Sequence, residues 1–188
     1  MTTNVFEIVV GRGTLKWDAV WRTIEWLADP TEGYGLGDQF RSRFSKFCLG
    51  SEASPIEVEV EYYLGQDTDG KTRHPDIAVG FPDLKHPELI ALIDDLGAKR
   101  PNDSRKINNL ITYAALCGSK FPNADLRIVV ITDTTDIGKF TKLKEAFSQH
   151  QSTALLFLPL QVIGSWIEEI GCYELPVVRD FAEWSTSL

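Results

Sequence analysis

The sequence reads His74-Pro75-Asp76-Ile77 and then, after one predicted strand and turn, Glu88-Leu-Ile-Ala-Leu-Ile-Asp94-Asp95-Leu96. The second stretch is an apolar run that ends in acidic residues, and another apolar run follows Asp76, so both stretches are typical of buried strands. Strands joined by a turn can bring Asp76 and Asp94 to one edge of a sheet. Carboxylate oxygens are the ligands that Mg²⁺ prefers. The sequence therefore predicts a Mg²⁺ or Mn²⁺ site that contains Asp76 and Asp94.

The adjacent Asp95 needs a separate interpretation. Successive side chains of a strand point to opposite faces, so Asp94 and Asp95 are not both expected to serve one site. We assign the metal-ligand role to Asp94, and we expect Asp95 to cap a turn or to pair with a local lysine or arginine.

The preceding residues predict a hairpin. Residues 56–64 (IEVEVEYYL) alternate strictly, which places a row of glutamates that includes Glu59 and Glu61 on one face of a strand. Turn-forming residues at 66–71 predict that residues 73–81 return antiparallel to it. Glu61 or Glu59 is our candidate for a third metal ligand. The simpler interpretation of this row is a solvated face of the sheet.

The remaining elements alternate between helices and strands. Periodicity predicts helices at residues 17–27, 37–47, 104–117, 139–149 and 160–170, and continuous apolar runs predict buried strands at residues 89–96, 126–132 and 154–160. The order predicts an α/β layered fold with a mixed central β-sheet flanked by helices. We expect a single domain over residues 1–188, with a helical lead-in at about 15–50 and a core at about 55–170.

Composition excludes several classes of protein. No apolar run reaches the roughly 20 residues of a membrane span, and the first residues do not resemble a leader, so we expect a cytoplasmic protein without a membrane partner. Three widely separated cysteines indicate neither a disulfide framework nor a zinc site. The net charge of −8 argues against indiscriminate nucleic-acid binding. A local basic cluster beyond Asp95, which contains Lys99, Arg100 and Arg105, is a candidate substrate-binding surface, although a solvated surface would have the same composition.

The order of these motifs resembles the PD-(D/E)XK nuclease superfamily, which has the restriction-endonuclease-like fold. Pro75-Asp76 matches the first half of its signature, and Asp94-Asp95-Leu96 stands where its acidic-x-lysine tripeptide would be. Residues 106–113 (KINNLITY) are similar to a helix that often carries a Gln-Leu-x-x-Tyr pattern, with asparagine here in place of the glutamine. Residues 24–30 and 35–37 resemble the helical lead-in of a group of bacterial nuclease-like proteins.

The resemblance implies a metal-dependent nuclease that hydrolyses DNA phosphodiester bonds in bacterial or phage defence. It is compatible with a homodimer, because dimers are common among DNA nucleases. Leu96 replaces the lysine of the tripeptide, and Lys106 on the following helix is our candidate for a displaced catalytic lysine. The alternative is a catalytically inactive pseudonuclease that binds or regulates a protein or nucleic-acid partner.

Overall fold

The computed structural model describes residues 36–50, 56–150 and 152–159, together with Val162, Ile163, Trp166 and Glu169. Contacts divide the chain into two compact units, one of residues 1–52 with 159–188 and one of residues 53–158. The predicted helix at residues 17–27 lies outside the described residues. So does most of the predicted closing helix at 160–170, of which the four named residues are helical.

The first unit contains α3 (Leu36–Leu49), which confirms the helix predicted at residues 37–47. Phe44 is 5% exposed, so the apolar side of α3 is buried. Phe47 meets Trp166 edge to face with ring centroids 6.1 Å apart, and Arg43 forms an ion pair with Glu169. Aromatic and ionic contacts therefore join α3 to the helical residues near the end of the chain.

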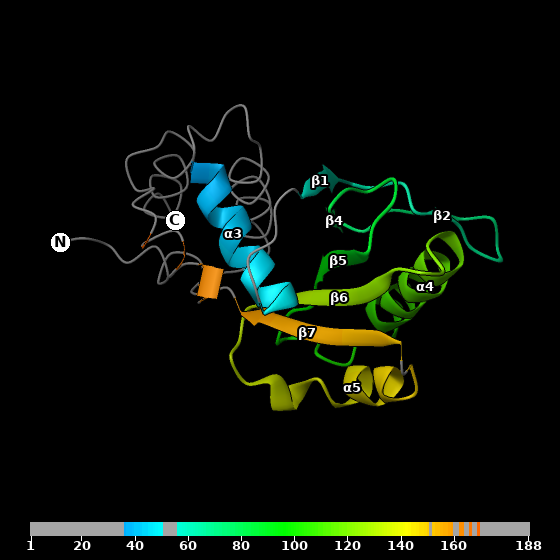
Figure 1. Ribbon diagram of the computed structural model, residues 1–188. Coiled ribbons are helices and arrows are strands. Elements are labelled where there is room, and N and C mark those ends of the chain that lie inside the picture. The colour runs from blue at the N-terminus through cyan, green and yellow to red at the C-terminus, as the bar shows by residue number, and fades with distance from the viewer. Residues whose placement is uncertain are drawn as a thin grey trace, which may run out of the picture. The chain divides into compact units, whose positions relative to one another are not determined.

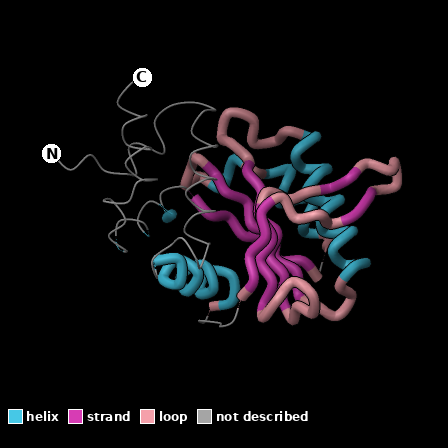
Figure 2. The backbone as a smooth tube through the Cα atoms, turned by 90° about the horizontal axis from the view of Figure 1, so that it is seen from above, coloured by secondary structure: helices cyan, strands magenta, loops and turns pink. Residues whose placement is uncertain are grey.

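The second unit is built on one five-stranded mixed sheet (Figures 1 and 2). Its strand order is β1 (Glu57–Val60), β4 (Ile77–Phe81), β5 (Leu89–Asp95), β6 (Asp125–Thr132) and β7 (Thr153–Pro159). The pairs β1–β4 and β4–β5 are antiparallel, whereas β5 and β6 are parallel. This arrangement confirms the predicted α/β class and the mixed sheet.

The hairpin of β4 and β5 positions the two acidic stretches. Ile77 pairs with Ile93, so the next position along this antiparallel register brings Asp76 opposite Asp94. The turn that joins the strands is tight, since a Cβ atom on Gly80 would lie 2.2 Å from the carbonyl oxygen of Asp83. A glycine is therefore required where β4 meets this turn.

The strand predicted at residues 56–64 is shorter than expected. It ends at Val60 because Glu61 has a positive φ of 48°, which turns the backbone out of the sheet. The chain then forms a separate two-stranded ribbon of β2 (Gly65–Gln66) and β3 (Thr72–Arg73). The predicted antiparallel pairing is therefore correct, but it is divided between two sheets, with β1 paired to β4 and β2 paired to β3.

Helices α4 (Ser104–Lys120) and α5 (Thr141–Ser148) contribute to one apolar core with alternate residues of the strands. A short 3-10 turn, η1 (Ile137–Lys139), precedes α5. The core includes Leu110, Leu143, Ile90, Leu92, Ile128 and Val130. Strand β7 was expected to be buried, but most of its residues are only half-buried because it forms an edge of the sheet. Among the described residues no helix has the length and hydrophobicity to cross a membrane.

Candidate metal centre

Three carboxylates converge where β5 ends and β4 begins. Asp76 immediately precedes β4, and Asp94 and Asp95 are the last two residues of β5. One oxygen atom from each of these side chains lies within 4.8 Å of the others. The structure thus brings together Asp76 and Asp94, the two residues that the sequence selected.

Asp95 joins the cluster although strand alternation argued against it. Its Oδ1 accepts a hydrogen bond of 3.0 Å from Nζ of Lys106, and its backbone N–H donates to Oδ1 of Asp94 over 2.7 Å. Asp95 is the terminal residue of β5, where the pleat no longer dictates the direction of the side chain. The expected pairing of Asp95 with a local lysine is therefore present, but within the cluster rather than apart from it.

Lys106 reaches the cluster from the first turn of α4. Its Nζ atom is 3.0 Å from Oδ1 of Asp94 and 3.0 Å from Oδ1 of Asp95. The start of α4 is fixed by Asp103, whose carboxylate accepts the backbone N–H groups of Arg105 and Lys106. Burial opposes the charge of Lys106, but the Asp94 and Asp95 carboxylates outweigh it and raise the pKa of the ammonium above its usual value. The site therefore favours the charged form of Lys106.

Asp76 is the least satisfied member of the cluster. Its Oδ2 atom is buried and has no hydrogen-bond partner among the described residues. Burial, followed by repulsion from Asp94 and Asp95, raises the pKa of Asp76 to about 8. A divalent cation would provide the missing partner and would offset the repulsion. The donor set, which contains only carboxylate oxygens, therefore fits Mg²⁺ or Mn²⁺.

Leu96, which stands where the resembled motif would have lysine, is a core residue. Its side chain is 2% exposed and belongs to the same apolar cluster as Ile107 and Leu110 of α4. Its backbone N–H donates to the carbonyl oxygen of Ile131, which extends the pairing of β5 with β6. Leu96 therefore contributes packing and not charge.

The structure does not bring the predicted third ligand, Glu61, into the cluster. Its side chain is exposed, and so is that of Glu59. Its backbone has a different role, because the N–H of Glu61 donates to the carbonyl oxygen of Asp76 over 2.8 Å and its own carbonyl oxygen lies 3.0 Å from Nδ1 of His74. Glu61 thus holds the segment that leads into Asp76.

The predicted substrate-binding residues surround the start of α4. Lys99 and Arg100 are exposed in the loop after β5, and Arg105 is exposed in the first turn of the helix. Hydrogen bonds from the backbone N–H groups of Lys106 and Arg105, with the nearby charges of Arg105 and Arg100, lower the pKa of Asp103. Exposed cations therefore lie next to the helical turn that carries Lys106.

Two α4 residues connect the helix to the strand segment before Asp76. The hydroxyl of Tyr113 donates to the carbonyl oxygen of His74 over 3.0 Å. Oδ1 of Asn109 accepts a hydrogen bond of 2.8 Å from Arg73, whose guanidinium also pairs with Asp67. The sequence offered no signal for the contact of Arg73 with α4, because Asn109 is 36 positions away in the chain.

Comparisons with protein-family models, with curated proteins and with solved structures give no match.

Proposed function

We propose that this protein is a divalent-metal-dependent nuclease with a restriction-endonuclease-like core that hydrolyses DNA phosphodiester bonds. The observation that carries the proposal is the convergence of Asp76, Asp94 and Asp95 with the ammonium of Lys106 at the end of the β4–β5 hairpin. The fold assignment is supported by an antiparallel hairpin that is followed by α4 and by a parallel strand, β6.

A divalent cation would be held by Asp76 and Asp94, with Asp95 beside them. A divalent cation supplies Lewis acidity, which stabilises negative charge on phosphoryl oxygens and makes water a stronger acid. The neutral form that Asp76 favours at pH 7 must lose its proton when the cation binds.

Lys106 acts as an electrostatic stabiliser. Its pKa is raised by Asp94 and Asp95 against the opposing effect of burial, so the residue keeps its proton and does not act as a general base. During hydrolysis the oxygen of water bonds to phosphorus, the P–O ester bond breaks, the proton of water passes to solvent and the leaving oxygen takes a proton from solvent. The ammonium lowers the free energy of the extra negative charge on phosphorus.

The exposed side chains of Lys99, Arg100 and Arg105 are the candidate phosphate contacts. They supply a local positive surface on a chain whose net charge is −8. Phosphate contacts position a nucleic acid without reading its sequence.

A second function is favoured by two observations. Lys106 already forms ion pairs with Asp94 and Asp95, and Leu96, which stands where the resembled motif would have lysine, is buried in the core. In a pseudonuclease the same contacts form a structural ion-pair network, and the domain binds or regulates a protein or nucleic-acid partner.

The deciding experiment measures cleavage of plasmid DNA and of single-stranded DNA by the purified protein in Mg²⁺ or Mn²⁺. Asp76→Ala is expected to abolish cleavage, whereas Glu59→Ala, which removes an exposed carboxylate from β1, is expected to cleave normally. Isothermal titration calorimetry measures Mg²⁺ binding independently of DNA cleavage. Asp76→Ala should lose this binding. Absence of cleavage by the wild type in both metals favours the pseudonuclease.

A further inference from the structure

An exposed aromatic pair lies on the segment that leads to Asp76. Tyr63 is 51% exposed, although its neighbours Tyr62 and Leu64 are buried in the core at 7% and 3%. The ring centroid of Tyr63 is 5.4 Å from that of His74, and the two rings are inclined by 50°. The core thus fixes the residues on either side of Tyr63 and leaves its ring accessible beside an imidazole.

The backbone of both aromatic residues is held by α4. Nζ of Lys120 donates to the carbonyl oxygen of Tyr63 over 3.2 Å, and the hydroxyl of Tyr113 donates to the carbonyl oxygen of His74 over 3.0 Å. Nδ1 of His74 also contacts the carbonyl oxygen of Glu61. These contacts restrain the pair in advance, so little conformational entropy is lost when a planar group stacks on it.

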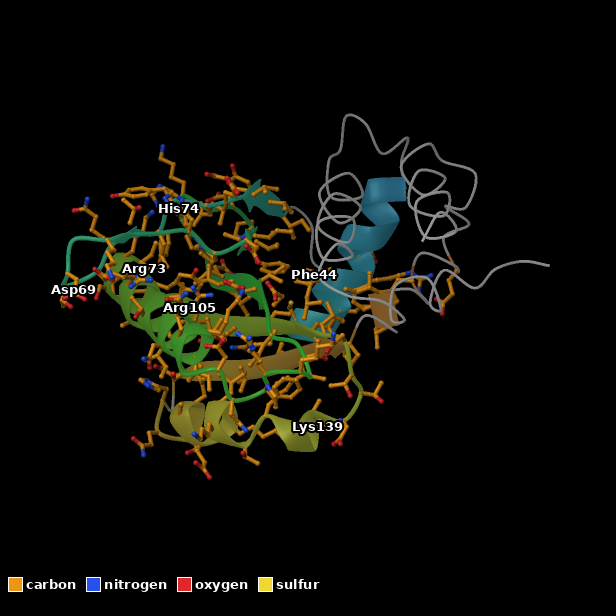
Figure 3. The ribbon with its side chains drawn as sticks, turned by 180° about the vertical axis from the view of Figure 1, so that it is seen from behind. Phe44, Asp69, Arg73, His74, Arg105 and Lys139 are labelled. Atoms are coloured by element: carbon orange, nitrogen blue, oxygen red, sulfur yellow. The ribbon has the colours of Figure 1, made fainter. Side chains whose placement is uncertain are left out.

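Tyr113 also relates the pair to the carboxylate cluster. The hydroxyl of Tyr113 donates to the carbonyl oxygen of His74, and Glu61 links His74 to Asp76, because its carbonyl oxygen lies 3.0 Å from Nδ1 of His74 and its N–H donates to the carbonyl oxygen of Asp76 over 2.8 Å. His74 is in addition two residues before Asp76 in the sequence. Figure 3 shows His74 beside Arg73, the β3 residue that is anchored to α4 through Asn109.

We infer that Tyr63 and His74 form a stacking site for the base of an unpaired nucleotide next to the phosphate that the carboxylate cluster receives. This inference rests on the proposed function and specifies its substrate as single-stranded DNA or an unpaired end. Every nucleobase has an aromatic face, so stacking on an exposed ring stabilises single strands with little dependence on sequence. The bases of a duplex are already stacked on each other and cannot occupy the site without unpairing.

Lys120 supplies a charge that suits the same ligand. Its ammonium is 4.6 Å from the centroid of the Tyr62 ring and is bonded to the carbonyl oxygen of Tyr63. Lys120 thus places a cation at the backbone of Tyr63, and positive charge near an exposed aromatic ring is typical of sites that bind single-stranded nucleic acids.

The test measures fluorescence anisotropy of a labelled oligothymidine, and of a duplex of the same length, with Ca²⁺ in place of Mg²⁺. Tyr63→Leu is expected to weaken binding of the single strand roughly tenfold and to leave binding of the duplex unchanged. Tyr63→Phe keeps the ring and should bind as the wild type does. Val60→Ala is the matched control, because Val60 is an exposed apolar residue, at 37%, that does not belong to the pair. Thermal denaturation of each variant verifies folding.

Equal affinities of Tyr63→Leu and the wild type for the single strand would overturn the inference, and so would an equal loss for both DNA forms or no binding by the wild type. The proposed function fails separately. If binding of the single strand depends on Tyr63 but the wild type cleaves no DNA, the proposed nuclease activity is refuted and the stacking site is retained. Asp76-dependent cleavage with affinity independent of Tyr63 would remove only the stacking site.

Discussion

The ammonium nitrogen of Lys106 lies 3.0 Å from Oδ1 of Asp94, although Lys106 belongs to the first turn of α4 and Asp94 to the end of β5. The same nitrogen contacts Asp95, so a single helical side chain forms ion pairs with two neighbouring strand carboxylates. Leu96, two residues after Asp94, lies in the core. The helix and not the strand therefore delivers the positive charge to this site.

If the protein is the proposed nuclease, Lys106→Met is expected to reduce the rate of DNA cleavage by roughly a hundredfold or more, because it removes the cation proposed to stabilise charge on phosphorus. Mg²⁺ affinity in calorimetry should persist or rise, since Lys106 competes with the metal for Asp94 and Asp95. The control is Lys142→Met, which changes an exposed lysine of α5 that has no part in the proposed site. Normal cleavage by Lys106→Met would assign the lysine a structural role only.

Asp76→Asn is expected to flatten the dependence of stability on pH. The pKa of Asp76 is raised from 3.8 to about 8, so the folded protein keeps a proton that the unfolded chain loses between these values. The free energy of unfolding contributed by this group therefore falls as pH rises through that window. We expect Asp76→Asn to exceed the wild type in stability at about pH 9, with a smaller difference at about pH 5.

Urea denaturation at several pH values measures this effect in the absence of divalent metal. Asp69→Asn is the control, because its carboxyl lies on an exposed residue of the β2–β3 turn. If the wild type and Asp76→Asn lose stability in parallel between the two pH values, the raised pKa of Asp76 is refuted.

Binding of Mg²⁺ should release a proton. Below about pH 8 the Asp76 carboxyl is largely protonated, and a bound cation requires the carboxylate. The apparent affinity should therefore weaken as pH falls below that value. Calorimetry in two buffers of different ionisation enthalpy measures the proton count, which is expected to vanish in Asp76→Asn together with most of the affinity. A pH-independent affinity would place the cation away from Asp76.

The sequence predicted the class of fold because its strands are continuous apolar runs and its helices are strongly periodic. It also predicted that Asp76 and Asp94 meet, which follows from the hairpin register that pairs Ile77 with Ile93. It overestimated the first strand, because nothing in an alternating run marks the positive φ at Glu61. For the same reason it predicted a metal ligand at Glu61. The backbone turns at this residue and leaves its side chain exposed.

Contacts between distant elements were accessible only in part. Lys106 was selected because α4 follows β5 directly, and a lysine in the first turn of such a helix is near the end of the strand. Asp95 joins the carboxylate cluster because the alternation of side chains is not maintained at the last residue of β5, and the sequence does not show where that strand ends. The bond of Arg73 to Asn109 joins residues 36 positions apart, and no local pattern encodes it.

Leu96→Lys tests whether the strand position can replace the helix as the source of the lysine. Leu96 is 2% exposed and packs in the same cluster as Ile107 and Leu110, so a lysine there must bury its ammonium or displace α4. We expect Leu96→Lys to lose about 2–5 kcal/mol of stability, whereas Leu96→Met, which conserves volume, should lose less than about 1.5 kcal/mol.

The double variant Leu96→Lys, Lys106→Met should remain inactive, because an ammonium that enters the core cannot contact the phosphate. Thermal denaturation and plasmid cleavage, measured together, separate loss of fold from loss of chemistry. A folded double variant that regains cleavage would show that β5 retains a functional lysine position. In that case the core would not require leucine at position 96, and Lys106 of α4 would be supplying the lysine that β5 lacks.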